Sequence, residues 1–299
     1  MMHRWAATLA LVLLAAPASA MPEDKFALQR TIYQEKSLYR NILVVESEDG
    51  YRCMKFGRLH ARQTCIHLAQ PQRLVLNYTK GLLAALYMAP TPRRVLIIGL
   101  GGGVLPMTLR ALDAQLEIDT VELDPAVVKV ARSHFRYQED ARVRTHVQDA
   151  RVFVRQQLRH AAQYDMVLVD AFDRDYIPEH LLTREFLQQL HRLLTPSGVL
   201  AANTFTAGAL SRHEAATYQA VFGQLYQLEL AGGNRILLAR RDGLPAWAQV
   251  QQQAHHWEAQ LASWGVLSAQ LLPRFRLQAS AAGVRVLTDQ YSPSNLLLP

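Results

Sequence analysis

One stretch decides the fold of this chain: residues 95–103, which read VLIIGLGGG. Its first four residues are apolar without interruption, which predicts a strand buried on both faces, because a strand with one face in water would alternate apolar and polar residues. The glycines follow where the chain must turn from that strand into a helix, and glycine lets a ligand approach the backbone amides of such a turn. A merely flexible turn would carry the same glycines, so the interpretation depends on the sequence that follows.

The chain after Pro92 repeats this alternation of strand and helix. Strands are expected at 95–98, 118–121, 143–147, 166–169 and 199–202, and helices after Gly103 and at 125–135, 150–160 and 186–194. Such alternation implies a parallel sheet covered by helices on both faces. Two later runs, 225–230 and 235–239, flank a glycine pair and predict a hairpin at the edge of the sheet.

Acidic residues stand just beyond three of these strands: Glu122, Asp149 and Asp170. Because the carboxyl ends of parallel strands lie along one rim, the three carboxylates and the glycine loop should share one crevice. Glu122 lies 19 residues after Gly103, where a carboxylate accepts hydrogen bonds from ribose hydroxyls, and Asp149 is placed to meet an adenine amino group. For each acid alone a helix N-cap remains the competing interpretation, above all for Asp149 before Ala150.

These observations predict an α/β fold class, namely a Rossmann-like fold of the S-adenosylmethionine-dependent methyltransferase type. Its nucleoside-binding residues are expected to be Gly99, Gly101, Gly103, Glu122 and Asp149. At the fourth strand end a carboxylate can accept the proton of an amine as the amine attacks, so Asp170 is the candidate catalytic base. An acid that only caps the following segment is the alternative for Asp170.

The front of the chain predicts a small antiparallel sheet, from β-type runs at 42–45, 51–56 and 64–68, followed by a helix over 74–88. Cys53 and Cys65 would face each other in the second and third of these strands. A disulfide and a pair of buried thiols both remain open, because the geometry of a cross-strand disulfide is demanding.

The first twenty residues predict an export signal. An uncharged run over 5–16 follows His3 and Arg4, and Ala18-Ser19-Ala20 is a typical cleavage site. The alternative is a short uncleaved anchor, although the run falls below the ~20 apolar residues that span a bilayer. We expect a signal peptide over 1–20, a β-rich domain with a linking helix over 21–90, the Rossmann-like domain over 91–242, and a C-terminal helix and tail over 243–299. The mature protein is then expected to be periplasmic, with no stable membrane insertion.

Composition argues against several other classes. The net charge of +7, or about +6 without Arg4, comes from scattered arginines, whereas nucleic-acid binding favours a clustered stripe. The histidines show no spacing typical of a metal site, and the nucleophile elbow of serine hydrolases is missing. We therefore expect neither a nucleic-acid partner nor a metal.

The chain resembles the spermidine synthase family of polyamine aminopropyltransferases. The matching residues run from Ser37-Leu38-Tyr39 through Tyr78, 95–99, 121–124, 148–150, Asp170 and Asp173 to Leu200. The resemblance implies a donor, decarboxylated S-adenosylmethionine, that passes its propylamine group to putrescine or a longer amine and leaves as methylthioadenosine. It implies no tightly bound cofactor and oligomers that are usually homodimers. By this resemblance Glu122 holds the ribose, Asp149 the adenine, Asp170 acts as the base, and Tyr78 and Asp173 hold the amine.

The sequence departs from the family at several positions that bear on substrate charge. The glycine loop lacks the family's aspartate and carries only Leu100 among its glycines, Lys80 stands where the family has an acid, and Arg40 replaces a glutamine. Because burial of an ammonium without a carboxylate costs several kcal/mol, fewer acids predict weak or altered amine binding. Two alternatives stay open: a methyltransferase that uses intact S-adenosylmethionine, and an exported ligand-binding protein without turnover.

Overall fold

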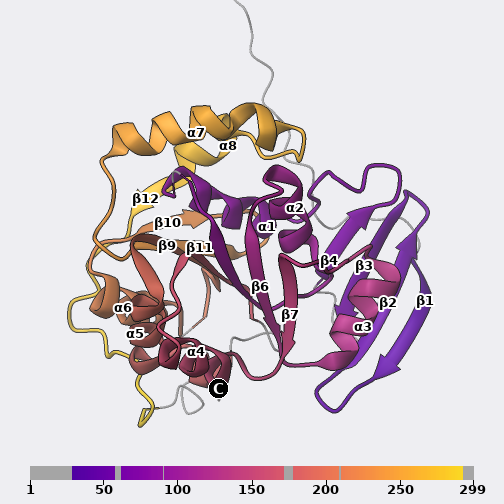
Figure 1. Cartoon of the computed structure of the whole chain (residues 1–299), viewed down its shortest axis with the longest axis horizontal. Helices are drawn as coiled ribbons and strands as arrows, with labels where there is room; N and C mark the ends of the chain where they lie inside the picture. Colours follow the sequence, from indigo (N-terminus) through magenta and orange to yellow (C-terminus); the bar gives the residue numbers. More distant parts are fainter. Residues whose placement is uncertain (1–28, 58–61, 90, 172–177, 209, 292–299) are drawn as a thin grey trace, which may run out of the picture.

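The computed structural model describes residues 29–57, 62–89, 91–171, 178–208 and 210–291, which form two sheets and the helices around them (Figure 1). The smaller sheet has the order β1-β2-β3-β4 and is antiparallel throughout. Its strands are β1 (Gln29–Lys36), β2 (Asn41–Ser47), β3 (Tyr51–Phe56) and β4 (Arg62–His67).

The larger sheet has the order β12-β10-β11-β9-β8-β5-β6-β7. The run β9-β8-β5-β6-β7 is parallel, as predicted, whereas β11, β10 and β12 are joined to it by antiparallel pairings. The strands are β5 (Arg94–Ile98), β6 (Glu117–Glu122), β7 (Val143–Val147), β8 (Tyr164–Val169), β9 (Leu194–Phe205), β10 (Tyr226–Glu229), β11 (Asn234–Arg240) and β12 (Phe275–Leu277). The predicted Rossmann-like α/β fold is confirmed.

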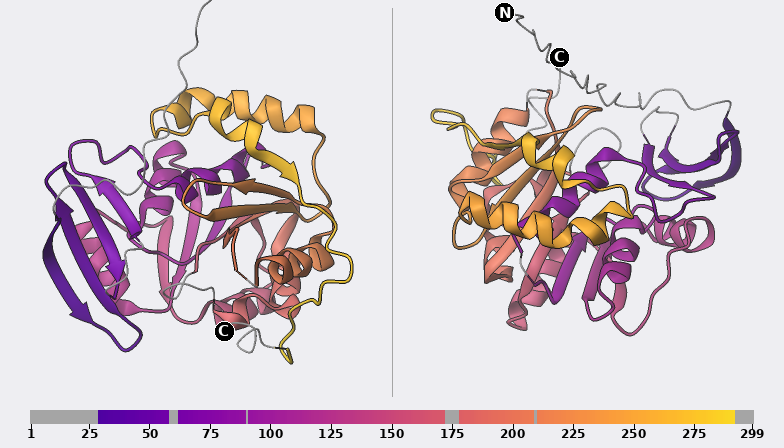
Figure 2. Two further views of the ribbon diagram at one scale, coloured as in Figure 1. Left: turned by 180° about the vertical axis from the view of Figure 1, so that it is seen from behind. Right: turned by 90° about the horizontal axis from the view of Figure 1, so that it is seen from above.

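Helices cover both faces of this sheet, because its central strands are apolar on both sides (Figure 2). One face packs against α1 (Asn77–Leu82), the 3-10 helix η1 (Leu83–Tyr87), α2 (Val104–Leu112) and α7 (Trp247–Ala262). The other packs against α4 (Ala150–Arg159), α5 (Arg184–Leu193) and α6 (Leu210–Phe222). Helix α3 (Pro125–His134) packs on the same face as α2 and also against the smaller sheet. The remaining helices are η2 (Glu179–Leu181), α8 (Ser268–Leu271) and η3 (Leu272–Arg274).

The smaller sheet is fastened to the larger unit through both of its faces. One face packs apolar side chains of β2, β3 and β4 against α3, with Phe135 at the end of that helix. On the other face Cys53 and Cys65, paired in register between β3 and β4, form a disulfide that packs with Leu76. Of the two interpretations left open for these cysteines, the disulfide is confirmed.

Two expectations for the fold are corrected. The segment 74–88 is not one helix: α1 begins only at Asn77, after Leu76 in extended backbone, and from Leu83 the chain continues as the 3-10 helix η1. The hairpin of β10 and β11 is confirmed, but it does not form the edge, because β12 from the C-terminal segment pairs outside β10. In the part of the chain that the structure describes, no helix has the length and apolar character needed to cross a membrane.

Candidate active site

The glycine loop lies where β5 ends, pressed against the end of β8. Gly99 has a φ of +96°, and a Cβ atom there would lie 2.2 Å from the carbonyl oxygen of Asp170. The backbone amide of Asp170 in turn donates to the carbonyl of Ile98 at 2.8 Å. Only glycine fits this contact, so the loop and the candidate base are held together by backbone.

The other two predicted loop glycines also adopt left-handed backbone. Gly103 is the N-cap residue of α2 and lies against the ring of Tyr137. Gly101 lies against Thr64 of β4, and the intervening amide of Gly102 donates to Thr64 Oγ1 at 2.8 Å. The loop is thus packed between the Rossmann-like unit and the smaller sheet.

Glu122 ends β6 as predicted and points toward the loop. One carboxylate oxygen accepts from the amide of Leu100 and the other from the amide of Asp124, each at 3.0 Å. Burial raises the pKa of Glu122, while the two amides and the positive charge of Arg40 oppose that shift. A buried acceptor at this position suits the hydroxyls of a ribose.

Asp149 serves as the N-cap of α4, as the competing interpretation held, and it also contacts His180. Its Oδ1 accepts from the amide of Val152 at 2.9 Å, and its Oδ2 lies 2.8 Å from Nε2 of His180. The hydrogen bond from His180 is the main reason that the pKa of Asp149 is lowered. The carboxylate is therefore an ionised acceptor with about a third of its side chain exposed.

The segment that carries His180 is fastened in turn by the C-terminal tail. Arg151, in the first turn of α4, donates to the carbonyl of His180 at 3.3 Å and to Asp289 Oδ1 at 2.8 Å. The tail also contributes Leu287, which is fully buried among α4, α5 and α6. Residues far beyond the strand ends thus fix one wall of the predicted adenine site.

Asp170 follows β8 and is partly buried. Its Oδ1 accepts from the side-chain amide of Asn203 at 3.0 Å. Burial, opposed by this hydrogen bond and reinforced by the charge of Glu122, raises its pKa to about 7. A carboxylate that titrates near neutral pH can take up and release a proton under ordinary conditions, as a general base requires.

Tyr78, on α1, lies in the same neighbourhood. Burial and the charge of Asp170 raise its pKa, and its hydroxyl donates to the backbone carbonyl of Gln63. The predicted residues Gly99, Glu122, Asp170 and Tyr78 are therefore brought together, with Asp149 at the next strand end. Asp173 lies outside the described residues.

Asp124 and Arg40 form the boundary between the two sheets. Asp124 caps α3 through the amide of Ala126 at 2.9 Å and accepts from the hydroxyl of Ser37 at 2.5 Å. The Nε of Arg40 lies 3.7 Å from Asp124, and its guanidinium stacks 4.4 Å from the centre of the Phe56 ring. The arginine that departs from the family thus lies beside the acids of the β6 end.

Sequence reasoning missed three residues that contact the predicted ones: Thr64, Asn203 and His180. Asn203 could have been found, because it lies near the carboxyl end of β9, the next strand along the same rim. Thr64 and His180 gave no comparable signal, since Thr64 reaches the site from the other sheet and His180 from the short 3-10 helix η2.

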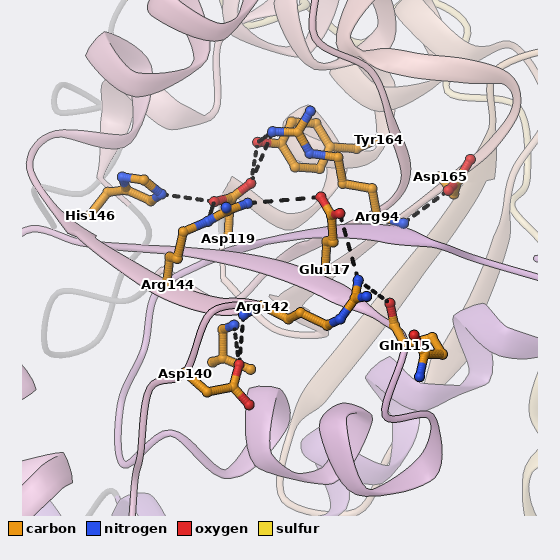
Figure 3. A network of polar contacts seen from close by, with 11 residues as sticks. Arg94, Gln115, Glu117, Asp119, Asp140, Arg142, Arg144, His146, Tyr164 and Asp165 are labelled. Carbon is orange, nitrogen blue, oxygen red and sulfur yellow. Dashed lines mark hydrogen bonds and ion pairs between the residues drawn. The ribbon is translucent and has the colours of Figure 1, made fainter.

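A second polar cluster is centred on Asp119, in the first half of β6 (Figure 3). Asp119 is 2% exposed, and its carboxylate accepts hydrogen bonds from four side chains, those of Arg94, Arg144, His146 and Tyr164. These hydrogen bonds and positive charges hold its pKa well below the usual range. Over the described residues no group of three or more histidine, cysteine or acidic side chains is arranged to hold a metal ion.

Known proteins resemble this chain in sequence and in architecture. A model of the spermine/spermidine synthase domain matches residues 81–226. A polyamine aminopropyltransferase of Vibrio vulnificus is 40% identical over 272 residues, which cover 89% of this chain and 91% of that protein. A solved structure of a probable spermidine synthase from Corynebacterium glutamicum superposes with a TM-score of 0.68 at 21% identity, over 89% of this chain and 99% of that one. Human methyltransferase-like protein 13, solved in complex with SAH, superposes with a TM-score of 0.59 at 25% identity, over 63% of this chain and 93% of that one.

Proposed function

The chain belongs to the spermine/spermidine synthase family, and on that premise we propose that it is an aminopropyltransferase acting on a polyamine such as putrescine. The donor in this proposal is decarboxylated S-adenosylmethionine, a co-substrate rather than a bound cofactor. The observation that carries the proposal is the position of Asp170, a carboxylate with a pKa of about 7 beside the glycine loop and Tyr78. The Vibrio vulnificus relative, which is 40% identical, is named for the same reaction.

The reaction needs a base more than it needs an acid. An amine nitrogen attacks the propyl carbon next to the sulfonium, the new C–N bond forms, and the C–S bond breaks with its electron pair going to sulfur. The leaving group, methylthioadenosine, is neutral and requires no proton. The attacking nitrogen must lose one, and Asp170 is the carboxylate placed to accept it.

In this proposal different strand ends contact different parts of the nucleoside. Glu122 accepts from the ribose hydroxyls, Asp149 accepts from the adenine amino group, and the amides of the glycine loop line the path between them. Tyr78 and Asp173 hold the amine acceptor. The support for these roles is the convergence of Glu122, Asp170 and Tyr78 around the glycine loop.

Calorimetric titration tests the donor half directly. We expect the wild-type protein to bind decarboxylated S-adenosylmethionine and methylthioadenosine, and Asp149→Ala to weaken both, because the adenine amino group loses its acceptor. Asp242→Ala is the matched control, since it removes an exposed acid that pairs with Arg240 instead of facing the predicted nucleoside. Failure of the wild-type protein to bind either compound would refute the proposal.

Methyl transfer from intact S-adenosylmethionine is a second candidate. The glycine loop offers no carboxylate to an amine at the donor's end, which suits a donor that keeps its own carboxylate, and human methyltransferase-like protein 13 was solved with SAH. Product mass separates the two reactions, because an aminopropyl group and a methyl group differ in mass. Methylated amine from intact S-adenosylmethionine would favour this second candidate.

The proposal extends to an exported, periplasmic location. It is supported by the Cys53–Cys65 disulfide, because disulfides persist mainly in oxidising compartments. Fractionation of expressing cells, with sequencing of the mature N-terminus, is expected to find Met21 first in the periplasmic fraction. Full-length protein in the cytoplasmic fraction would refute this part.

A further inference from the structure

Two neighbouring residues of β4 each hydrogen-bond to a different half of the candidate site. Thr64 Oγ1 accepts from the amide of Gly102 at 2.8 Å, in the glycine loop. The backbone carbonyl of Gln63 accepts from the hydroxyl of Tyr78, on the predicted amine side. A strand of the smaller sheet thus contacts both the donor loop and the acceptor residue.

The contact between Thr64 and the loop is close as well as polar. A Cβ atom on Gly102 would lie 2.5 Å from the Thr64 methyl carbon, and one on Gly101 would lie 2.7 Å from its hydroxyl oxygen. Thr64 is buried, at 6% exposure. Loss of its hydroxyl would leave the Gly102 amide without this acceptor in a buried place, which is costly enough to shift a loop made largely of glycine.

Thr64 is itself held by the next residue. Successive side chains of a strand point to opposite faces, so Thr64 faces the loop and Phe135 while Cys65 faces away. Cys65 is bonded to Cys53 and packs with Leu76, and Tyr78 packs against the same cluster. The disulfide-bonded hairpin therefore fixes the position of the Thr64 hydroxyl relative to the glycine loop.

We propose that Thr64 is a positioning residue of the donor site: its hydroxyl, carried on the disulfide-bonded hairpin, holds the glycine loop in its nucleoside-binding conformation. The inference rests on the proposed function, because it assumes that the glycine loop binds the nucleoside donor. A loop that is already ordered loses less conformational freedom when the nucleoside binds, so the hydroxyl contributes to affinity without touching the ligand. The smaller sheet then takes part in donor binding as well as in packing.

The test compares Thr64→Val, which keeps the shape and removes the acceptor, with Thr64→Ser, which keeps the hydroxyl. The first readout is hydrogen exchange of the amides of 99–103 in ligand-free protein, and the second is the Kd of methylthioadenosine by calorimetry. We expect Thr64→Val to exchange these amides faster and to weaken binding by about tenfold, and Thr64→Ser to stay within about twofold of wild type. In turnover, Thr64→Val should raise the KM for the donor by a larger factor than it lowers kcat, although Thr64 also hydrogen-bonds to the Tyr78 side chain.

The disulfide is tested in the same way. The double variant Cys53→Ser with Cys65→Ser should speed exchange of the same loop amides, because the hairpin is no longer cross-linked. If the loop amides of the double variant exchange at the wild-type rate, the contribution of the disulfide is refuted.

The outcomes separate this inference from the proposed function. If wild-type protein binds methylthioadenosine while Thr64→Val shows wild-type exchange and affinity, the positioning role is refuted and the proposed function stands. If the wild-type protein binds no adenosyl compound, the proposed function fails, and with it the donor role of Thr64. Should Thr64→Val fail to fold, Thr64→Ala removes the same acceptor without an added methyl group and is judged by the same two readouts.

Discussion

The side-chain amide of Asn203 donates a hydrogen bond of 3.0 Å to Asp170, and Asn203 accepts one of the same length from the amide of Asn234. Asn203 is almost fully buried near the end of β9. A donor to a carboxylate favours the ionised form, so Asn203 opposes the rise in the pKa of Asp170 that burial causes. The two asparagines thus tune the candidate base.

Replacement of this donor should shift the pH dependence of turnover. In Asn203→Leu the Asp170 carboxylate loses a hydrogen bond to its ionised form, so its pKa rises further. We expect the midpoint of the rising limb of kcat/KM against pH to move up by about one unit. Asn234→Ala, which removes only the second bond, should shift it less and in the same direction. An unchanged midpoint in Asn203→Leu would contradict the assignment of Asp170 as the base.

The raised pKa of Asp170 also predicts how stability depends on pH. The ordinary value is 3.8 and the folded value about 7, so between these values the folded state keeps a proton that the unfolded state releases. The unfolded state then binds fewer protons, and the free energy of unfolding falls as the pH rises from 4 to 7. Asp170→Asn has no carboxyl to titrate, so its stability does not fall in this way. Measured with urea, the free energy of unfolding of the variant should therefore rise relative to that of wild type between pH 5 and pH 8. A constant difference at the two pH values would show that the carboxyl is not perturbed.

Gly99→Ala should disrupt the loop by a steric contact in addition to backbone strain. Gly243→Ala is a matched control, because Gly243 has a φ of +97° against +96° at Gly99 but no described atom within 4 Å of a built Cβ. Both variants pay about 1–2 kcal/mol for a side chain in left-handed backbone. Gly99→Ala should lose at least about 2 kcal/mol more in urea unfolding, together with nucleoside binding, because the Asp170 carbonyl must move. If the two variants lose the same free energy of unfolding, the close approach of Gly99 to the Asp170 carbonyl does not contribute to stability.

Asp119 should matter for stability and not for donor binding (Figure 3). Asp119→Asn removes the charge that Arg94, Arg144 and His146 face, and we expect a loss of about 2 kcal/mol in the free energy of unfolding at pH 7. Glu117→Gln, on the same strand and about half exposed, should cost less than about 0.5 kcal/mol. Because the pKa of Asp119 is lowered on folding, its contribution is complete above the ordinary value of 3.8 and is lost as the pH falls below it. If Asp119→Asn and Glu117→Gln lose comparable free energies of unfolding, the hydrogen bonds around Asp119 are not the source of this stability.

Much of the fold could be predicted because its core strands are continuous apolar runs. The strand predicted at 95–98 lies within β5, and Asp170 was found because it follows such a run directly. By contrast β1 is polar and largely exposed, so Gln29–Lys36 shows little of the alternation that marks a strand. Helix α6 was missed because it buries Glu214 and Thr217 as well as apolar residues, which hides its apolar face.

The candidate site was predictable only where a residue follows its own strand. Glu122 and Asp149 could be placed from spacing, but their partners, Arg40 and His180, come from distant parts of the chain. The tie from Asp289 to Arg151 joins residues 138 positions apart, and no local pattern carries such a contact. Periodicity reports which residues are buried, whereas these contacts depend on how separate elements pack.

Formation of methylthioadenosine and spermidine from decarboxylated S-adenosylmethionine and putrescine tests the central claim most directly. Initial rates should be measured by mass spectrometry on wild-type protein and on Asp170→Asn, with binding of methylthioadenosine as evidence that the variant keeps its fold. The account predicts turnover by wild type and a loss of at least about 10²-fold in Asp170→Asn with donor binding retained. No aminopropylated product from folded, donor-binding wild-type protein, or full activity in Asp170→Asn, would contradict it.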